Sequence, residues 1–219
     1  MSRIAVLGAG HTGPIVARMA VETGHQVSIA ASGDPRRIAL IAQVLAPGAE
    51  ARWADDAVRD ADIVVLALPM HTFAELDPAL FAGKLVVDIM NYWPPNDGVL
   101  AMFENTERGS SEVVADRLSG ATVVKTLNHI GYHDMDERRR PAGAPGRLAL
   151  GVAGDDPAAV DTIAGLIDAF GFDPVRFGSL SAGRGFEPGQ PVFGALLTSA
   201  EFLDELGSEF LDELGSPVS

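Results

Sequence analysis

Three glycines near the start of the chain have the spacing of a phosphate-binding turn. In IAVLGAGHTG, Gly8, Gly10 and Gly13 follow an apolar run in G-x-G-x-x-G order and open a stretch with helical periodicity. In this setting the first glycine permits a tight turn, the second lets the backbone approach a pyrophosphate, and the third lets helix and strand pack closely. N–H groups at the helix start would bind the phosphates, with His11 and the hydroxyl of Thr12 in the same turn. The segment therefore predicts a dinucleotide site.

The end of the second predicted strand indicates which dinucleotide to expect. A site for NAD carries Asp or Glu about twenty residues after the glycines, where it binds the ribose hydroxyls. This chain has Ala-Ala-Ser-Gly at 30–33. Ser32 can donate a hydrogen bond, and arginine pairs well with a 2′-phosphate, with Arg36 the first choice and Arg37 the second. Asp34, directly before a proline, is better explained as a helix cap. The sequence favours NADP(H).

Histidine side chains gather where later strands are expected to end. His129 and His133 are candidates for catalysis, as contacts to a substrate or as proton donors to a carbonyl or imine. With His71 they could also bind a metal, but Gly131 lies between them after a strand-like segment, so one shared helix face is not expected. A third interpretation makes both histidines structural. The sequence leaves the catalytic and structural roles open and predicts no metal site.

Alternating strands and helices must position these residues. Strands are expected at 3–7, 26–31, 52–53, 62–68, 84–89, 122–127, 147–153 and 172–177, helices at 12–22, 35–45, 109–118 and 156–170, and a loop at 128–146. Strands that are apolar throughout and joined by helices are typical of a parallel sheet covered on both faces. We therefore expect an α/β fold of the Rossmann type, a doubly wound, mostly parallel sheet with helices on both faces, in a single domain over residues 1–198.

Residues 199–219 are expected to form an acidic helical tail. The octapeptide EFLDELGS occurs at 201–208 and again at 209–216. One apolar stripe would contain Phe202, Leu203, Leu206, Phe210 and Leu214. Such a stripe fits a surface helix packed on its own domain, and it also fits a dimerisation arm, which leaves a homodimer open. We expect the tail to be dispensable for cofactor binding, because it is terminal and its charge repels an anionic cofactor.

Composition excludes several functional classes. The 219 residues carry a net charge of −14, which opposes nucleic-acid binding because that function needs clustered Lys and Arg. No stretch approaches the roughly eighteen apolar residues of a membrane span, and the first apolar run is too short for a signal peptide. Cysteine is absent, so disulfides and thiolate metal sites are excluded. We expect a cytoplasmic protein whose partners are small molecules.

Six segments, taken in their order along the chain, resemble the family of deazaflavin (coenzyme F-420)-dependent NADP oxidoreductases. The resemblance rests on IAVLGAGHTG, ADIVVLALP, GKLVVDIMNYW, VVKTLNHIGYH, ALGVAGDDPAAV and GFDPVRFGSL, and it runs from the N-terminus to about residue 193. It implies a nicotinamide near Leu68, Pro69 and Met70, with contacts from the segments of Asn91 and Asn128. Members often have Asn-Ser-Arg after the second strand, whereas this chain keeps the serine and has glycine in place of the arginine.

Three functions are compatible with these residues. The resemblance implies hydride transfer between NADP(H) and coenzyme F-420, which needs neither a nucleophile nor a metal. An alternative is an NADPH-dependent reductase of a small carbonyl or imine, with a histidine or Tyr132 as proton donor. A second alternative is a protein that senses NADP(H) without turnover.

Overall fold

The computed structural model describes residues 1–104 and 107–213, and the side chains of the helical residues 207–213 lie outside that description. The chain forms two compact units. Unit 1 comprises residues 1–90 and 115–122, and unit 2 comprises residues 91–114 and those from 123 onward. Among the described residues, no helix is both long and apolar enough to cross a membrane.

Five strands of unit 1 form a parallel sheet in the order β3-β2-β1-β4-β5. They are β1 (Arg3–Leu7), β2 (Gln26–Ala30), β3 (Glu50–Ala51), β4 (Ile63–Leu66) and β5 (Leu85–Asp88). From β1 the chain runs outward to β2 and β3, and it then returns to place β4 on the other side of β1. The strand order therefore reverses between β1 and β4, and open α/β sheets bind ligands at the carboxyl ends of the strands at such a point.

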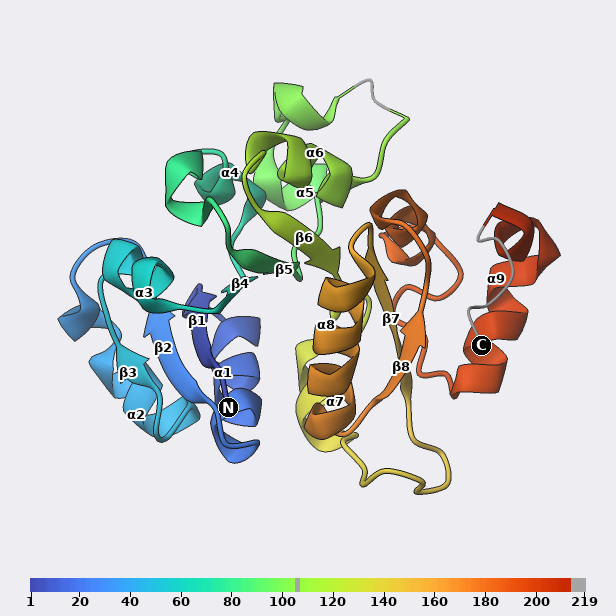
Figure 1. Cartoon of the computed structure of the whole chain (residues 1–219), viewed down its shortest axis with the longest axis horizontal. Coiled ribbons are helices and arrows are strands. Elements are labelled where there is room, and N and C mark those ends of the chain that lie inside the picture. The colour runs from blue at the N-terminus through green and yellow to red at the C-terminus, as the bar shows by residue number, and fades with distance from the viewer. Residues whose placement is uncertain (105–106, 214–219) are drawn as a thin grey trace. The chain divides into compact units, whose positions relative to one another are not determined.

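Short helices cover this sheet (Figure 1). They are α1 (Thr12–Glu22), η1 (Pro35–Arg37, a 3-10 helix), α2 (Ala39–Leu45), α3 (Ala54–Asp60), α4 (Met70–Phe73) and the 3-10 helix η2 (Pro78–Phe81). Helix α1 packs on β1, β2 and α2, while α3 packs on β1, β2 and η2. Helix α1 ends where the sequence predicts, because Gly24 adopts a positive φ of 87° just beyond it.

Unit 2 combines parallel and antiparallel strands. Strand β7 (Ala149–Gly154) runs antiparallel to β6 (Thr122–Lys125) and parallel to β8 (Asp173–Arg176). Its helices are α5 (Pro94–Asp97), η3 (Ala101–Phe103), α6 (Ser110–Arg117), α7 (Tyr132–Glu137), α8 (Pro157–Phe170), η4 (Leu180–Phe186) and α9 (Ser199–Glu213); residues 115–117 of α6 and Thr122 of β6 belong to unit 1. Helix α8 packs on β7 and β8, and η4 and α9 pack on β7.

The α/β fold of the Rossmann type is confirmed, with differences in detail. The predicted helix at 35–45 is divided at Ile38 into η1 and α2. The third strand occupies 50–51 rather than 52–53, because only Glu50 and Ala51 pair with β2. The predicted loop at 128–146 contains α7, which begins directly after Gly131. A glycine-rich, charged composition concealed this short helix, whose Met135 is fully buried.

Candidate cofactor and catalytic residues

Close packing explains two of the three glycines in the phosphate turn. The N–H of Gly8 donates to the carbonyl of Ala30 (2.8 Å), and the φ of Gly8 is 123°. A Cβ on Gly8 would lie 2.1 Å from the oxygen of Ala67, and a Cβ on Gly13 would lie 1.9 Å from the oxygen of Gly8. Both positions therefore require glycine for the fold alone.

Gly10 differs from its two neighbours. No described heavy atom beyond its chain neighbours lies within 4 Å of a Cβ built on it, and its φ lies outside the left-handed region. Neither packing nor backbone conformation therefore explains a glycine here. A ligand that approaches the backbone closely would explain it, as the pyrophosphate does in the predicted site.

The first turn of α1 is open to an anion. His11 is the N-cap residue, and within the described chain its side chain makes no capping hydrogen bond to the helix. Thr12 begins the helix, and its first turn contains no acidic residue. The N–H groups and the positive end of the helix dipole thus meet no protein carboxylate in that turn, which suits a phosphate.

The residues after β2 are arranged differently from the prediction in one respect. Asp34 caps η1 as predicted, since its Oδ1 accepts the N–H of Arg36 at 2.9 Å. The same carboxylate also holds the side chain of Arg36, whose Nε lies 3.0 and 2.9 Å from the two oxygens. These hydrogen bonds lower the pKa of the Asp34 carboxyl group. The preferred phosphate partner, Arg36, is therefore already paired with a carboxylate.

Arg37 is better placed to meet a ligand at this turn. Its Nη1 lies 4.0 Å from the Cβ position of Gly33, so the side chain reaches back along the turn that follows β2. Ser32, the other predicted contact, is exposed in the same turn. This geometry favours Arg37 over Arg36 as the candidate for the phosphate contact.

The three residues expected near the nicotinamide have unequal exposure. Leu68 is half-buried, and Pro69 is exposed directly before α4. Met70 has no exposed surface and belongs to the core of unit 1. Met70 therefore offers no accessible surface to a cofactor here, while Leu68 and Pro69 do.

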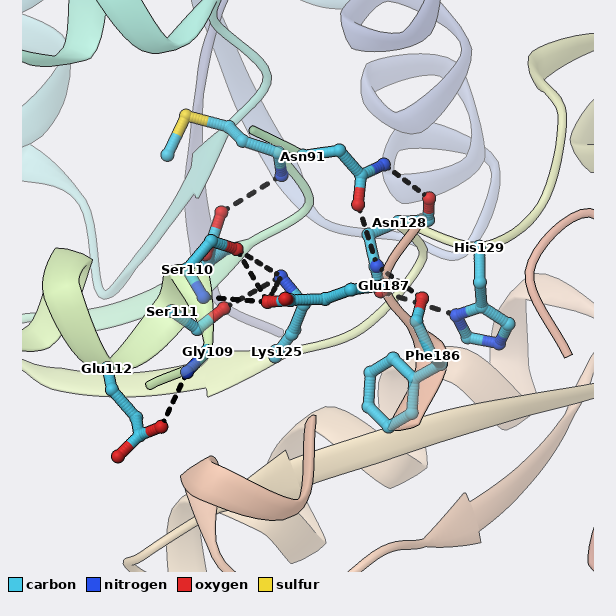
Figure 2. Close-up of polar contacts among 12 residues, drawn as sticks. Asn91, Gly109, Ser110, Ser111, Glu112, Lys125, Asn128, His129, Phe186 and Glu187 are labelled. Carbon is cyan, nitrogen blue, oxygen red and sulfur yellow. Dashed lines mark hydrogen bonds and ion pairs between the residues drawn. The ribbon is translucent and has the colours of Figure 1, made fainter. Parts of the chain in front are cut away.

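Asn91 and Asn128 lie together in unit 2, where their amides bind one another (Figure 2). Asn91 Nδ2 donates to the carbonyl of Asn128 at 2.6 Å, and Asn128 Nδ2 donates to Asn91 Oδ1 at 3.0 Å. Asn128 Nδ2 also donates to the carbonyl of Phe186 at 2.8 Å. The two side chains therefore hold three segments of unit 2 together, a positioning role that the sequence could not distinguish from cofactor contact.

His129 occupies a structural position. It is 2% exposed, its Nε2 accepts the N–H of Gly151 at 3.2 Å, and its Nδ1 lies 3.3 Å from Asn128 Oδ1. Its ring centroid lies 4.9 Å from that of Phe186 and 5.6 Å from that of Phe202. Burial, aided by the charge of Lys125, lowers the pKa of His129 to about 3. A proton donor at neutral pH is not expected to have these properties, so the structure argues against the predicted catalytic role.

His133 differs from His129. It is exposed on α7, and its ring centroid lies 4.1 Å from that of Tyr132. His133 and Tyr132 therefore remain candidates for proton transfer. In the part of the chain that the structure describes, no three His, Cys, Asp or Glu residues are grouped so that they could hold a metal ion.

The buried histidine predicts a loss of stability in acid. Because folding lowers the pKa of His129 from 6.5 to about 3, the unfolded chain binds a proton that the folded chain does not bind between these values. Stability from this group is complete above pH 6.5 and falls by about 1.4 kcal/mol per pH unit as the pH decreases toward 3. Between pH 7 and pH 5 we expect a loss of about 2 kcal/mol from His129.

Urea unfolding at pH 7 and pH 5 measures this loss. Acidic residues that titrate nearby affect the protein and its His129→Gln variant alike, and glutamine can still accept the N–H of Gly151. The difference in unfolding free energy between the two pH values should be smaller in His129→Gln by about 2 kcal/mol. An equal pH dependence in both proteins would show that folding does not lower the pKa of His129, so that it is protonated in the folded protein at pH 5.

Lys125 is the residue that sequence reasoning missed. It ends β6 and has no exposed surface. Its Nζ donates to Ser111 Oγ at 2.9 Å and to Ser110 Oγ at 3.2 Å, and it lies 3.5 Å from Glu187 Oε1 (Figure 2). The signal in the sequence is a lysine at the end of the apolar run TVVK. The backbone two residues after Lys125 is also unusual, because the bulky Leu127 has a φ of 61°, in the left-handed region. A backbone strained in this way persists only where the surrounding structure imposes it.

Comparison with known proteins extends these observations. The structure resembles the hypothetical protein SMa0349 of Sinorhizobium meliloti, with a TM-score of 0.78, 27% identity, and coverage of 91% of this chain and 96% of that one. It also resembles a protein of Arthrobacter sp. FB24 that is provisionally described as an F420-dependent NADP reductase. There the TM-score is 0.70 and the identity 28%, with 84% of this chain and 88% of that one covered.

Two curated proteins match in sequence. The rat metalloreductase STEAP3 is 26% identical over 187 residues, which are 84% of this chain and 36% of STEAP3. Protein YjhV of Escherichia coli K12 is 44% identical over 59 residues, 27% of this chain and 43% of YjhV. The chain thus spans less than half the length of these curated relatives.

The family comparison covers the part of the chain that contains the phosphate turn. Residues 3–92 match the family described as "NADP oxidoreductase coenzyme F420-dependent". This range includes nearly all of unit 1 and ends just beyond Asn91. This match confirms the resemblance noted in the sequence: residues 3–92 are similar to the coenzyme F420-dependent NADP oxidoreductase family.

Proposed function

We propose that the protein is an NADP(H)-dependent oxidoreductase that binds the dinucleotide at the phosphate turn of unit 1. The observation that carries this proposal is Gly10, whose missing side chain is explained by neither packing nor strain. The open first turn of α1 and the position of Arg37 near Gly33 support the same binding mode. The nicotinamide, when bound, supplies a hydride donor or acceptor.

The hydride partner that we propose is the deazaflavin coenzyme F-420. Support comes from the family description over residues 3–92. Hydride transfer between two flat cofactors asks the protein to bind both rings, orient them and exclude water, and it needs no nucleophile. The lack of cysteine and the neutral, buried state of His129 are compatible with that requirement.

A second candidate is reduction of a small carbonyl or imine by NADPH. The observation that favours it is the pair on α7 of half-buried Tyr132 and exposed His133, because a phenol or imidazole can donate a proton to a reduced carbonyl or imine. In that case Tyr132→Phe or His133→Gln should bind NADPH normally and lose turnover. A protein that only senses NADP(H) would bind it tightly and reduce neither acceptor.

One assay separates these functions. Purified protein is mixed with NADPH and oxidised coenzyme F-420, and with NADH in parallel, while the deazaflavin absorbance is followed. We expect the absorbance to decrease with NADPH and much more slowly with NADH. Tight NADPH binding without any deazaflavin reduction would reject F-420 as the hydride partner and leave the two alternatives.

Selectivity for NADPH provides a prediction about the two arginines. Arg37→Ala should raise the Kd for NADPH by about tenfold or more, because a charge-assisted hydrogen bond to phosphate contributes roughly 1.5–3 kcal/mol. The Kd for NADH should change little. Arg36→Ala is the matched control, and its effect should be smaller because Asp34 already holds Arg36.

Fluorescence titration of both dinucleotides measures these constants. Higher salt should reduce the effect of Arg37→Ala, since ions screen an exposed charge pair. Equal affinity of the unsubstituted protein for NADH and NADPH would reject the NADP assignment, and Asp34 would then become a candidate ribose ligand.

A further inference from the structure

Helix α2 lies at the edge of unit 1 beside β3, and its inner and outer faces are both apolar (Figure 1). Ile38, Ala42 and Ala46 follow one another four residues apart and are buried, because α2 packs on α1 and β3. Leu40 and Val44 lie on the opposite face, where they are 70% and 62% exposed. A surface helix normally carries polar residues on its outer face, whereas a helix that is apolar all round is normally buried. The outer face of α2 therefore has the composition of a contact surface.

A groove of about 460 Å³ lies next to this outer face. It is lined by α2 and by the segment that leads from α2 into β3, and small side chains predominate, among them Ala39, Ala42, Ala49 and Ala51. Protruding aliphatic side chains and a recess of small residues thus adjoin one another on a single surface. A protruding side chain that fills such a recess is the usual centre of a protein–protein interface.

Charge also sets this surface apart. The chain has a net charge of −14, so two copies repel one another over most of their surfaces. Residues 39–49 contain no charged side chain. Asp34, Arg36 and Arg37 precede this segment with one more positive than negative charge, and the exposed, negatively charged Glu50 follows it. Two such segments in antiparallel orientation would bring the basic end of each to the acidic end of the other.

From these features we propose that two copies of the chain associate through α2 about a two-fold axis, with the two helices antiparallel. Leu40 and Val44 of each copy enter the groove of the other. A two-fold interface requires a surface that complements itself, and here the protruding residues and the recess belong to the same surface. Burial of the aliphatic side chains supplies the attraction, and the charges at the two ends of the segment set the antiparallel direction.

The C-terminal tail, which the sequence leaves open as a dimerisation arm, is less suited to this role. Phe202 and Leu206 are buried in a core cluster of unit 2, so they are not available to a second copy. Phe210 and Leu214, the other residues of the predicted stripe, have side chains outside the described residues. Among the side chains that the structure describes, those of α2 therefore fit a second copy better.

Sedimentation equilibrium of the full chain without a dinucleotide tests the proposal, and its outcome does not depend on the proposed oxidoreductase function. We expect a monomer–dimer equilibrium between about 1 and 300 µM, with a Kd in the roughly micromolar range that is typical of a small interface. Leu40→Glu and Val44→Glu should each raise the Kd at least about tenfold, because a carboxylate would enter an apolar groove.

The fold should tolerate both substitutions, because Leu40 and Val44 are exposed in the single chain. Their unfolding temperatures at low concentration should therefore equal that of the unsubstituted protein. Val99→Glu is the matched control, since Val99 is 77% exposed in unit 2 and the variant adds the same charge away from α2. A dimer that Leu40→Glu and Val44→Glu weaken no more than Val99→Glu does would have its interface elsewhere, and the proposal would be wrong.

One further variant separates a fitted groove from a surface that is merely apolar. Ala39 is exposed and lines the groove. Ala39→Phe makes the surface more apolar, but it fills the recess that the side chains of the other copy must enter. The Kd should therefore rise at least about tenfold, because shape complementarity is lost. Tighter association of Ala39→Phe would contradict the proposed packing.

A mixture of two variants tests the antiparallel direction. Residue 40 of one helix would lie opposite residue 44 of the other. Leu40→Glu and Val44→Lys should each associate weakly alone, and an equimolar mixture at least about tenfold more tightly, because the new carboxylate then meets the new ammonium group. The second contact of the mixed pair is again Leu40 with Val44. A mixture no tighter than its components, or an unsubstituted protein that stays monomeric up to about 300 µM, would overturn the proposal.

Discussion

Replacing Gly10 with Asp is expected to weaken NADPH binding at least about a hundredfold, about 2.7 kcal/mol, while the fold is retained. Apart from its chain neighbours, no described heavy atom lies within 4 Å of a Cβ at this position, so a Cβ displaces no protein atom and the fold should tolerate it. The new side chain would instead occupy the space that the pyrophosphate needs, and its carboxylate would repel the phosphates. Isothermal titration with NADPH and thermal unfolding of the same sample measure the two effects.

The neighbouring glycines supply the control. A Cβ on Gly13 would lie 1.9 Å from the carbonyl oxygen of Gly8, and backbone atoms cannot move apart without disturbing the packing of α1. Gly13→Ala should therefore lower the unfolding temperature, and binding should be lost together with the fold. The assignment of the phosphate turn would be wrong if Gly10→Asp bound NADPH with unchanged affinity.

Most of unit 1 can be predicted from the sequence because its elements follow one another along the chain. The apolar strand, the glycine turn and the helix up to Gly24 are adjacent in sequence, and each has its own local signal. The cap at Asp34 is equally local, since a carboxylate before proline bonds the N–H two residues later. The choice between Arg36 and Arg37 is harder to predict from the sequence, because it depends on which of the two side chains forms hydrogen bonds to the Asp34 carboxylate.

The roles of residues in unit 2 depend on partners far along the chain. Asn128 binds the carbonyl of Phe186, 58 residues away, and His129 is covered by Phe186 and Phe202. A histidine in the motif NHIGYH has the same sequence context whether it is buried or exposed. Only the burial that these distant aromatic rings impose identifies His129 as structural and leaves His133 as the accessible one.

Removal of the Lys125 side-chain charge should destabilise unit 2 by about 3 kcal/mol, the cost of breaking a buried ion pair from one side. In Lys125→Met the two serine hydroxyls lose a donor, and the carboxylate of Glu187 loses the cation 3.5 Å away. The methionine side chain is similar in length to the aliphatic part of lysine. Its packing against Gly183 is therefore largely kept, where a Cβ would lie 2.9 Å from Lys125 Cδ. Urea unfolding of the variant measures the loss.

Glu187→Gln separates the charge effect from the packing effect. The N–H and the hydroxyl of Ser110 donate to Glu187 Oε1 at 2.8 and 2.7 Å, and a glutamine oxygen can still accept them. If the ion pair causes the loss, Lys125→Met should cost at least about 1 kcal/mol less in the Glu187→Gln background, because no uncompensated carboxylate remains there. An equal cost in both backgrounds would assign the role of Lys125 to its serine contacts. Glu187 directly follows Phe186, whose carbonyl accepts a hydrogen bond from Asn128. Glu187→Gln should therefore also loosen the contact between Asn91 and Asn128, and amide hydrogen exchange at residues 127–129 should become faster.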